Sequence, residues 1–375
     1  MRVLVVNAGS SSLKHALVDG ADDAVLARGE ERWEPDGDAG RHGRALAAAL
    51  AATAAGGAVE AIGHRVVHGG PRFHGPQRID AGVRAAIAAL APLAPLHTRA
   101  ALEGIDAAAA ALPDLPQVAC FDTAFHRTLA PEAATYALPR AWRERFGLRR
   151  YGFHGLNVAW CHEQAARVLG AEHCGRLVVC HLGSGCSVSA VRDGASIDTT
   201  MGFTPLDGLP MATRSGSVDP GLLLHLLGSG VGLDELDDAL NHRSGLRGIA
   251  GRAGLREVER AAIGGDERAQ LAFDVLVRGA SGAVAAMSTS LRGLDGLVFS
   301  GGAGERSALL RASICARLAH LGVELDPGSN ARHVERISAG RTTVAVLVVP
   351  AGEEIVIARE TTHVVGAAPA RGGER

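Results

Sequence analysis

The chain opens with a hydrophobic run, a stretch of small polar residues and then an alternating pattern. Residues 3–6 are aliphatic and mostly β-branched, and they are numerous enough for one buried strand. Residues 7–12, Asn-Ala-Gly-Ser-Ser-Ser, predict a turn in which Gly9 lets successive N–H groups point at one anion. Residues 13–17 alternate as a second strand would, and the Asp-Gly pair at 19–20 predicts a tight hairpin. The stretch fits either a phosphate-binding strand–turn–strand or an N-terminal hairpin with a polar turn.

The same pattern occurs a second time near the middle of the chain. Residues 177–194, LVVCHLGSGCSVSAVRDG, align with residues 3–20 without a gap at an offset of 174. The identical pairs are Val5/Val179, Gly9/Gly183, Ser10/Ser184, Ala16/Ala190, Asp19/Asp193 and Gly20/Gly194. A repeat at about half the chain length predicts two related domains, each with a phosphate-sized turn, that close on a nucleotide.

The rest of the pattern predicts alternating helices and strands. An edge strand with a surface loop is expected over residues 21–43. Helices are expected over 44–55, 81–90 and 98–112, and strands over 61–67, 116–121 and 294–300. The Gly-Gly-Ala-Gly-Glu stretch at 301–305 is expected to form a turn that opens a helix near Arg306, and the tail from Gly366 is expected to be disordered.

Three polar side chains stand at positions that predict a binding role. Arg65 lies within an apolar strand and needs a partner, either a buried carboxylate or an anionic substrate, because an unpaired buried charge is costly. Asp122 follows the strand expected at 116–121, where open α/β sheets tend to carry their ligand-binding residues. His97 comes at a helix N-terminus, where anions are favoured.

Composition limits the class of protein. The 375 residues suit two domains, and a net charge of −2 argues for neither nucleic acid nor an anionic membrane as a partner. No apolar run approaches the roughly 20 residues of a membrane span, and Met1 leads into a strand without a signal-peptide pattern, so a cytoplasmic protein is expected. The six cysteines form no CxxC pair, so reduced core thiols are expected rather than zinc ligands.

Lys14 is the single lysine among 38 lysine and arginine residues, and it lies at the edge of the first polar turn. Either an arginine-rich composition left it there by chance, or a compact point charge is needed at this position.

Nine motifs resemble the acetate kinase family in order and spacing: NAGSSSLK, GHRVVHGG, APLH, FDTAFH, RRYGFHG, HLGSG, DTTMGFTPLDGLPMATRSG, SGGAGE and GEEIVIAR. The resemblance runs from Val3 to about Thr361. It implies an α/β fold with two duplicated ribonuclease H-like (actin-like ATPase) domains and a nucleotide and substrate cleft between them. The first domain would combine residues 1–123 with 354–375, and the nucleotide-binding domain would be 124–353.

The resemblance also implies catalytic roles. Arg65 and Arg214 match two arginines at the acyl carboxylate and the transferring phosphoryl group, which suit guanidinium forks because both ions present paired oxygens. Asp122 matches an acidic residue near the attacking carboxylate and the metal, and His154 matches a histidine that donates to the phosphoryl group. His97 matches a second imidazole near the substrate.

Further positions match the family's binding residues. The apolar pocket for the acyl methyl would be formed by Val67, Leu96, Phe153 and Pro205. The pair associated with Mg²⁺, a cation that prefers oxygen ligands, would be Asn7 and Glu353. The nucleotide and phosphate residues would be Ser10, Ser12, Lys14, His181, Gly183, Ser184, Gly185, Arg256, Gly302 and Gly304.

Several positions depart from the family's usual residues. The family's usual Gly-Thr-Ser-His is Gly-Leu-Asn-Val at 155–158, and its usual Asn in HLGNG is Ser184. The family's usual Asp-Phe-Arg is Gly-Leu-Arg at 254–256, so that Gly254 replaces the Asp. An Asn is replaced by Arg306, and Thr-Asn is replaced by Ala-Gly at 351–352. Most of these changes fall on the nucleotide side, so weak or poorly selective nucleotide binding is expected.

The resemblance implies a homodimeric, Mg²⁺-dependent kinase that interconverts ATP and acetate with ADP and acetyl phosphate. Three alternatives stay open: a preference for propionate or butyrate, a phosphoryl donor other than ATP, or a weakly active relative that binds nucleotide or acyl phosphate.

Overall fold

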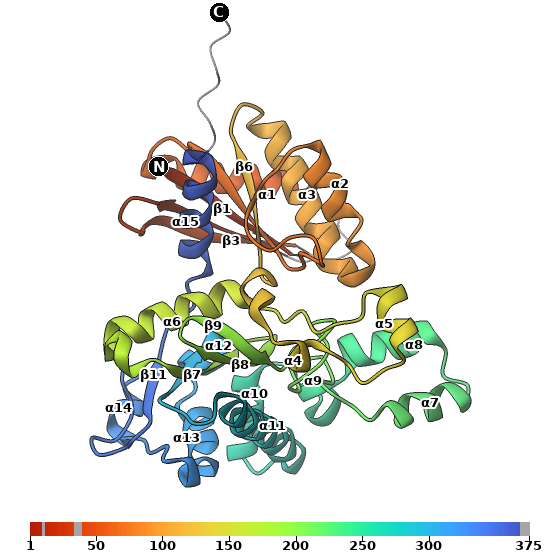
Figure 1. The fold of residues 1–375 in the computed structure, drawn as a ribbon, viewed down its shortest axis with the longest axis vertical. Coiled ribbons are helices and arrows are strands. Elements are labelled where there is room, and N and C mark those ends of the chain that lie inside the picture. The colour runs from red at the N-terminus through yellow and green to blue at the C-terminus, as the bar shows by residue number, and fades with distance from the viewer. Residues whose placement is uncertain (10–11, 34–39, 368–375) are drawn as a thin grey trace, which may run out of the picture. The chain divides into compact units, whose positions relative to one another are not determined.

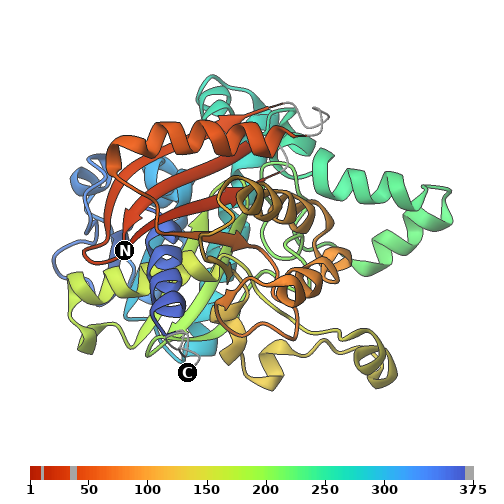
Figure 2. The same cartoon turned by 90° about the horizontal axis from the view of Figure 1, so that it is seen from above.

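The computed structural model describes residues 1–9, 12–33 and 40–367, apart from the side chains of residues 95 and 96. Contacts divide the chain into two compact units. The first consists of Met1–Arg127, Phe153–Asn157 and Gly352–Arg375, and the second consists of Thr128–Gly152 and Val158–Ala351. The first unit therefore contains both the red and the blue ends of the chain in Figures 1 and 2.

The first unit is built on a six-stranded sheet with the order β3-β2-β1-β4-β6-β5. Its strands are β1 (Arg2–Ala8), β2 (Ser12–Asp19), β3 (Ala24–Arg32), β4 (Ala61–Val66), β5 (Gln77–Arg78) and β6 (Gln117–Phe121). Its main helices are α1 (Arg41–Thr53), α2 (Ala81–Ala88), α3 (Pro95–Ala111) and α15 (Glu353–Gly366). Short 3₁₀ turns are η1 (Ala54–Gly56), η2 (Ala91–Leu93) and η3 (Ala124–Thr128).

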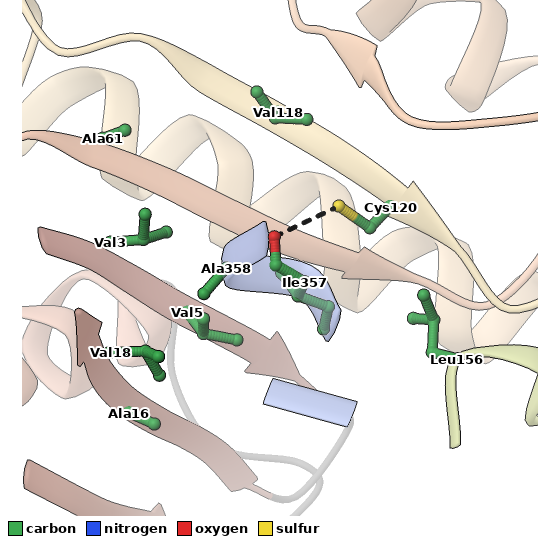
Figure 3. Packing of buried hydrophobic residues seen from close by; sticks show 10 residues of the cluster. All are labelled: Val3, Val5, Ala16, Val18, Ala61, Val118, Cys120, Leu156, Ile357 and Ala358. Carbon is green, nitrogen blue, oxygen red and sulfur yellow. Dashed lines mark hydrogen bonds between the residues drawn. The ribbon is translucent and has the colours of Figure 1, made fainter. Parts of the chain in front are cut away.

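Helix α15 covers one face of this sheet (Figure 3). The cluster on this face consists of Val3, Val5, Ala16, Val18, Ala61, Val118, Cys120, Leu156, Ile357 and Ala358. The Cys120 thiol also donates to the carbonyl oxygen of Ile357 at 3.8 Å, which ties β6 to α15. The opposite face, with Leu4, Val6 and Leu13, packs against α1 and α3. Because side chains alternate along each strand, the two faces of the sheet receive alternate residues.

The second unit contains a five-stranded sheet with the order β11-β10-β7-β8-β9. Its strands are β7 (Arg176–Leu182), β8 (Cys186–Arg192), β9 (Ala195–Thr199), β10 (Gly296–Ser300) and β11 (Ala345–Val348). Its α-helices, with α6 beginning in the first unit, are α4 (Pro131–Ala134), α5 (Arg140–Phe146), α6 (Gly155–Leu169), α7 (Pro220–Gly228), α8 (Leu233–Asp238), α9 (Gly245–Ala250), α10 (Leu255–Ile263), α11 (Glu267–Leu291), α12 (Gly301–Arg306), α13 (Ala308–Arg317) and α14 (Pro327–Ala331). Shorter segments are the 3₁₀ turns η4 (Ala171–His173) and η6 (Ala319–Leu321) and the π-helical segment η5 (Ala239–Arg243).

The two sheets confirm the internal repeat. In the first, β1 pairs antiparallel with β2, β2 with β3, and parallel pairs join β1 to β4 and β4 to β6. In the second, β7, β8 and β9 form the same antiparallel meander, and β7–β10–β11 form the same parallel series. A register shift also recurs, at Leu17/Val18 in β2 and at Ala190/Val191 in β8. The duplicated α/β fold expected from the sequence is therefore present.

The gapless alignment of the two copies is wrong beyond the polar turn. Ala8 pairs with Leu13 after an intervening stretch of four residues, whereas Leu182 pairs with Cys186 after an intervening stretch of only three residues. The second turn is one residue shorter, so the strands after the turns correspond at an offset of 173 rather than 174, as the shared register shift shows. The deletion was not apparent from the sequence, because the identical pairs 19/193 and 20/194 favoured an alignment without a gap.

The Asp-Gly hairpin is confirmed in the second copy only. Arg192 pairs with Ala195, and Asp193 and Gly194 have φ values of 49° and 80°, as a two-residue type I′ turn requires. In the first copy, Asp19 pairs with Ala24, so residues 20–23 form a longer loop.

The Gly-Gly-Ala-Gly-Glu stretch is helical, and the expected turn with a helix from about Arg306 is wrong. Helix α12 begins at Gly301, immediately after β10, and α13 follows it. Gly301 has a φ of 77°, and a Cβ there would lie 2.9 Å from the carbonyl oxygen of Leu182. This glycine lets the chain change from strand to helix within one residue.

By length and composition, α11 could cross a membrane, with a mean hydropathy of 1.3 over its most apolar window. Half of that window is buried, and the helix packs against β7 and β8. The core helix of a globular unit passes the same test, so this is weak evidence for a span.

All six cysteines are buried free thiols. Residues 368–375 of the tail expected to be disordered lie outside the described residues, and Gly366 is the last residue of α15.

Candidate active site

Arg65 and Asp122 form a close ion pair at neighbouring strand ends of the first unit. Arg65 is in β4, and Asp122 directly follows β6. Nε of Arg65 donates to Oδ1 of Asp122 at 3.0 Å, and Nη2 donates to Oδ2 at 2.7 Å. The Asp122 side chain is 1% exposed and that of Arg65 is 17% exposed. The buried carboxylate considered as a partner for Arg65 is therefore Asp122, in the bidentate geometry of the strongest charge-assisted pairs.

Part of the Arg65 guanidinium remains directed away from Asp122. Nη1 lies 3.7 Å from Oε1 of Glu353, the first residue of α15. Burial disfavours the charged form, but the charges of Asp122 and Glu353 and the hydrogen bond to Asp122 outweigh it and raise the pKa of Arg65. Since Asp122 occupies the edge formed by Nε and Nη2, the edge formed by Nη1 and Nη2 keeps N–H donors for an anion.

His154 lies on a strained backbone beside Asp122. It has a φ of 59°, a left-handed conformation that a residue with a Cβ rarely adopts. The N–H of Gly155 donates to the carbonyl oxygen of Asp122 at 3.0 Å. A Cβ on Gly155 would lie 2.1 Å from that oxygen, so only glycine allows this approach. His154 thus lies one residue from a direct contact with the Asp122 backbone.

The polar side chains of β1 and β2 point to the same sheet face as Arg65 and Asp122. Val3 and Val5 face α15, so alternation places Asn7 on that face, and Ala16 and Val18 place Lys14 there. Asn7 and Lys14 pair directly across the two strands. Lys14 also lies opposite Glu30 of β3.

The position of Glu30 offers a second explanation for the presence of a lysine at position 14. A hydrogen bond from Arg32 is the main cause that lowers the pKa of Glu30, and the Lys14 charge adds to it. The Lys14 charge therefore acts on a neighbouring carboxylate, which offers an explanation of this lysine besides the expected phosphate role.

The remaining residues expected in the first unit lie around these strand ends. Val67 directly follows β4, and His97 is the third residue of α3, as expected for a helix N-terminus. Phe153 is buried, and its ring meets His68 edge-on at 5.3 Å. The N–H of Gly9 donates to the carbonyl oxygen of Ser12 at 2.7 Å and closes the first polar turn. Ser10 and the Leu96 side chain lie outside the described residues.

In the second unit, Arg214 lies beside the second glycine turn. Nη1 of Arg214 donates to the carbonyl oxygen of Pro205 at 3.4 Å. Burial lowers the pKa of Arg214, against a small opposing effect of Cys186. Burial also raises the pKa of the Cys186 thiol to about 12, and its sulfur donates to the carbonyl oxygen of Gly183 at 3.5 Å. Among the described residues Arg214 forms no ion pair, which leaves its charge available to an anion.

The residues expected at the nucleotide lie on adjoining elements of the same unit. His181 is in β7 and pairs with Ser300 of β10, so the turn at 183–185 and helix α12, with Gly302 and Gly304, follow neighbouring strands. Arg306 extends back over Gly302, where a Cβ would lie 2.4 Å from the arginine Nη2.

Arg256 is exposed on α10. Glu259 of the same helix accepts a hydrogen bond from Ser307, directly after α12. This contact brings the helix of Arg256 to the end of α12.

Arg311 is a buried charge that the sequence did not single out. It is 0% exposed, and its guanidinium donates to the carbonyl oxygens of Gly304 and Glu305 at 2.7 and 2.8 Å. Asn330 accepts two more of its hydrogen bonds, through Oδ1 and the carbonyl oxygen. Arg311 thereby satisfies the terminal carbonyls of α12. The feature of the sequence that could have identified Arg311 was its position on the buried side of helix α13.

The donors expected for Mg²⁺ suit this cation without forming a complete cage. Among the described residues, no three His, Cys, Asp or Glu side chains gather closely enough to hold a metal ion. Asn7 and Glu353 offer an amide and a carboxylate oxygen, and Mg²⁺ usually binds through one or two protein oxygens together with water and phosphate.

Two solved structures that closely resemble this chain are kinases of short carboxylates. The chain superimposes on a propionate kinase from Francisella tularensis subsp. tularensis SCHU S4 with a TM-score of 0.91, 37% identity and coverage of 97% of this chain and 99% of that one. The acetate kinase of Porphyromonas gingivalis gives a TM-score of 0.88 with 34% identity, at the same coverage. Fold and site thus define a kinase of the actin-like ATPase fold.

Sequence comparison gives the family. A model of the acetokinase family matches residues 45–359. The acetate kinase of Leifsonia xyli subsp. xyli is 45% identical in an alignment of 394 positions that covers 97% of this chain and 99% of the relative. That of Deinococcus deserti is 46% identical, with 98% of each chain covered. The chain belongs to the acetokinase family, as the motifs indicated.

Proposed function

We propose that the chain is an acetate kinase that transfers the γ-phosphoryl group of ATP to acetate and runs in either direction. The observation that carries the proposal is the Arg65–Asp122–Glu353 cluster with His154 beside it, because it presents cationic donors to an anion next to acidic residues. In the forward direction an acetate oxygen forms a bond to the γ-phosphorus. The bond from that phosphorus to the β,γ-bridging oxygen breaks, and ADP leaves with the electron pair.

The residues of the first unit bind and orient the acid. The free Nη1–Nη2 edge of Arg65 binds the acetate carboxylate, and Asp122 holds the guanidinium in place from the other edge. Val67, Leu96 and Phe153 contact the methyl group, and Pro205 is assigned the same role. His97 lies near the carboxylate, and His154 donates to the phosphoryl oxygens. Such positioning is a main source of acceleration when two anions must meet.

The residues of the second unit and the metal act on the phosphates. Arg214 donates to the transferring phosphoryl group, which gains stabilisation where charge is redistributed in the transition state. The turn at 183–185, with His181, Arg256, Gly302 and Gly304, binds the nucleotide, while Ser10, Ser12 and Lys14 contact phosphate. Asn7 and Glu353 would hold Mg²⁺, which neutralises phosphate charge when bound. As domains of the chain we propose residues 1–123 with 354–375, and residues 124–353; the first unit defined by contacts additionally includes residues 124–127, 153–157 and 352–353.

A hydroxamate assay for acyl phosphate tests the proposal, with acetate, propionate and butyrate as acceptors and ATP, GTP and pyrophosphate as donors. Acetyl phosphate formation from ATP is expected, with loss of activity on chelation of Mg²⁺. A preference for propionate is the second candidate, because a propionate kinase is among the similar structures. Failure to phosphorylate any of these acids with any donor would indicate a binding protein instead.

We further propose a cytoplasmic homodimer that binds neither nucleic acid nor membranes. Helix α7 supports self-association, because none of its residues is buried and Leu224 and Leu227, three residues apart on one helix face, are 70% and 41% exposed. Contiguous exposed apolar surface commonly marks a protein interface. Analytical ultracentrifugation should show a dimer for the unmodified chain and more monomer for Leu224→Glu. A monomer at micromolar concentration would contradict the proposal.

A further inference from the structure

The segment Phe153–Asn157 is held by the first unit at both sides of His154. On its C-terminal side, the N–H of Gly155 donates to the carbonyl oxygen of Asp122 at 3.0 Å. On its N-terminal side, Nε2 of His126 lies 3.0 Å from the carbonyl oxygen of Phe153. The two hydrogen bonds flank one residue, and that residue has the left-handed φ of 59°.

The His126 ring is built into the unit as a neutral donor. His126 belongs to η3 directly after Asp122 and Thr123, and its side chain is 1% exposed. A carbonyl oxygen can only accept, so Nε2 carries the proton in this hydrogen bond. Burial lowers the pKa of His126 to about 4, although the Phe153 carbonyl and the Asp122 charge favour protonation. The ring therefore stays neutral at neutral pH and has a single N–H, which is used here.

The left-handed conformation of His154 requires support from its surroundings. A residue with a Cβ disfavours this region, and such residues persist at functional sites only where neighbouring contacts hold them. The hydrogen bond from His126 fixes the peptide plane before His154, and the Asp122 carbonyl fixes the one after it. Without the first bond, the buried Phe153 carbonyl would lose its donor and the peptide plane could rotate.

We infer that His126 is a positioning residue that holds the backbone of His154, and hence its imidazole, in the orientation needed for phosphoryl transfer. This inference rests on the proposed function, in which His154 donates to the phosphoryl group. His126 itself contacts a backbone carbonyl and is not assigned a contact with substrate. It acts on turnover only through His154.

Two substitutions of His126 distinguish the effect of losing the hydrogen bond from the effect of losing the volume of the ring. His126→Leu fills the space but has no donor, whereas the side-chain amide of His126→Gln can present an N–H near the position of Nε2. A matched control is His64→Leu, because His64 is equally buried, has a pKa lowered to about 4 and bonds the Gln117 side chain at 2.7 Å. His64 lies on the opposite sheet face from Arg65, so its loss should reduce stability without changing kcat.

The kinetic test is a double-mutant cycle with His154→Ala. His126→Leu should lower kcat roughly tenfold to a hundredfold with KM changed little, since small misplacements of a catalytic group have effects of this size. His126→Gln should recover most of the loss. In the His154→Ala background His126→Leu should change kcat less than twofold to threefold, because a residue that acts only through another shows no additional effect.

Hydrogen exchange supplies a readout that does not depend on activity. Exchange of the peptide covering residues 151–157 should accelerate in His126→Leu and stay near the unmodified rate in His126→Gln and His64→Leu. If the unmodified chain phosphorylates no carboxylate, the proposed function fails while this measurement still tests the positioning role. The inference is overturned by unchanged exchange in His126→Leu, by additive losses of kcat in the cycle, or by an equal loss of kcat in His64→Leu.

Discussion

Removal of the Arg65 side chain should destabilise the first unit as well as abolish turnover. The Asp122 side chain is 1% exposed in the unmodified chain, and in Arg65→Ala its carboxylate loses both guanidinium hydrogen bonds. Breaking a buried ion pair by removing one partner costs about 3–5 kcal/mol, because the other charge stays buried without compensation. That is a large part of the roughly 5–15 kcal/mol that holds a domain folded.

The double variant Arg65→Ala with Asp122→Asn should be clearly more stable than Arg65→Ala alone. The side-chain amide that replaces the Asp122 carboxylate is neutral, so the remaining cost is that of an unsatisfied polar group, about 1–3 kcal/mol. Arg84→Ala is a matched control, because Arg84 also forms a bidentate pair, with Asp106, but the two side chains are 44% and 50% exposed. Exposed pairs contribute about 0–1 kcal/mol.

The assay is urea unfolding, monitored by hydrogen exchange of peptides from β4 and β6. These peptides report on the stability of the first unit separately from the second. Acyl phosphate formation is then compared at urea concentrations and temperatures where each variant is folded. Turnover should fall by orders of magnitude in both Arg65 variants. If Arg65→Ala is no less stable than Arg84→Ala, or if the double variant is as unstable as Arg65→Ala, the buried-charge reasoning is wrong.

Three further outcomes are expected. Lys14→Arg should lose activity if its ammonium contacts phosphate, and should keep activity if Lys14 serves only as the cross-strand partner of Glu30; steady-state kinetics decides. Calorimetry should show weak or unselective binding of ATP, GTP and pyrophosphate, and Ser184→Asn with Gly254→Asp should strengthen ATP binding about tenfold for each 1.4 kcal/mol regained. Stability should fall between pH 6.5 and 4, because His64 and His126 have pKa values lowered to about 4 by burial and stay neutral in the folded state. Their contribution, about 3 kcal/mol each, is complete above pH 6.5 and lost as the unfolded state takes up protons; urea midpoints across this range measure it.

The central strands of both sheets could be predicted because buried parallel strands appear as apolar runs, whereas β5, β9 and β11 were not among the expected strands. Residues 3–6 and 177–180 fall in β1 and β7 on this basis, and the strand expected at 294–300 overlaps β10 from residue 296. The lengths of the polar turns could not, since a deletion between two strands leaves the apolar pattern on either side intact. Helix α12 was also missed, because its first four residues are the glycines and alanine of Gly-Gly-Ala-Gly, which predict a turn.

Two of the departures from the family's residues meet in the structure. The side-chain Oδ1 of Asn157 accepts a hydrogen bond from the N–H of Gly352 at 3.3 Å, directly before Glu353. Read along the sequence, the loss of an asparagine at 352 and the change at 157 are independent changes. In three dimensions the amide at 157 serves the backbone at 352, so the number of departures overstates how much of this region is changed.

The partner of Arg65 shows why a sequence can identify a site residue and still leave its chemistry open. From the sequence, a buried carboxylate and an anionic substrate were competing explanations for one charge. The structure places Asp122 on the Nε–Nη2 edge of the guanidinium, with Nη1 3.7 Å from Glu353. A guanidinium has five N–H donors on two edges that can each engage a carboxylate. The two explanations therefore do not compete, because the pair with Asp122 orients the other edge, and a variant that preserves charge but not the planar fork, such as Arg65→Lys, cannot satisfy both partners.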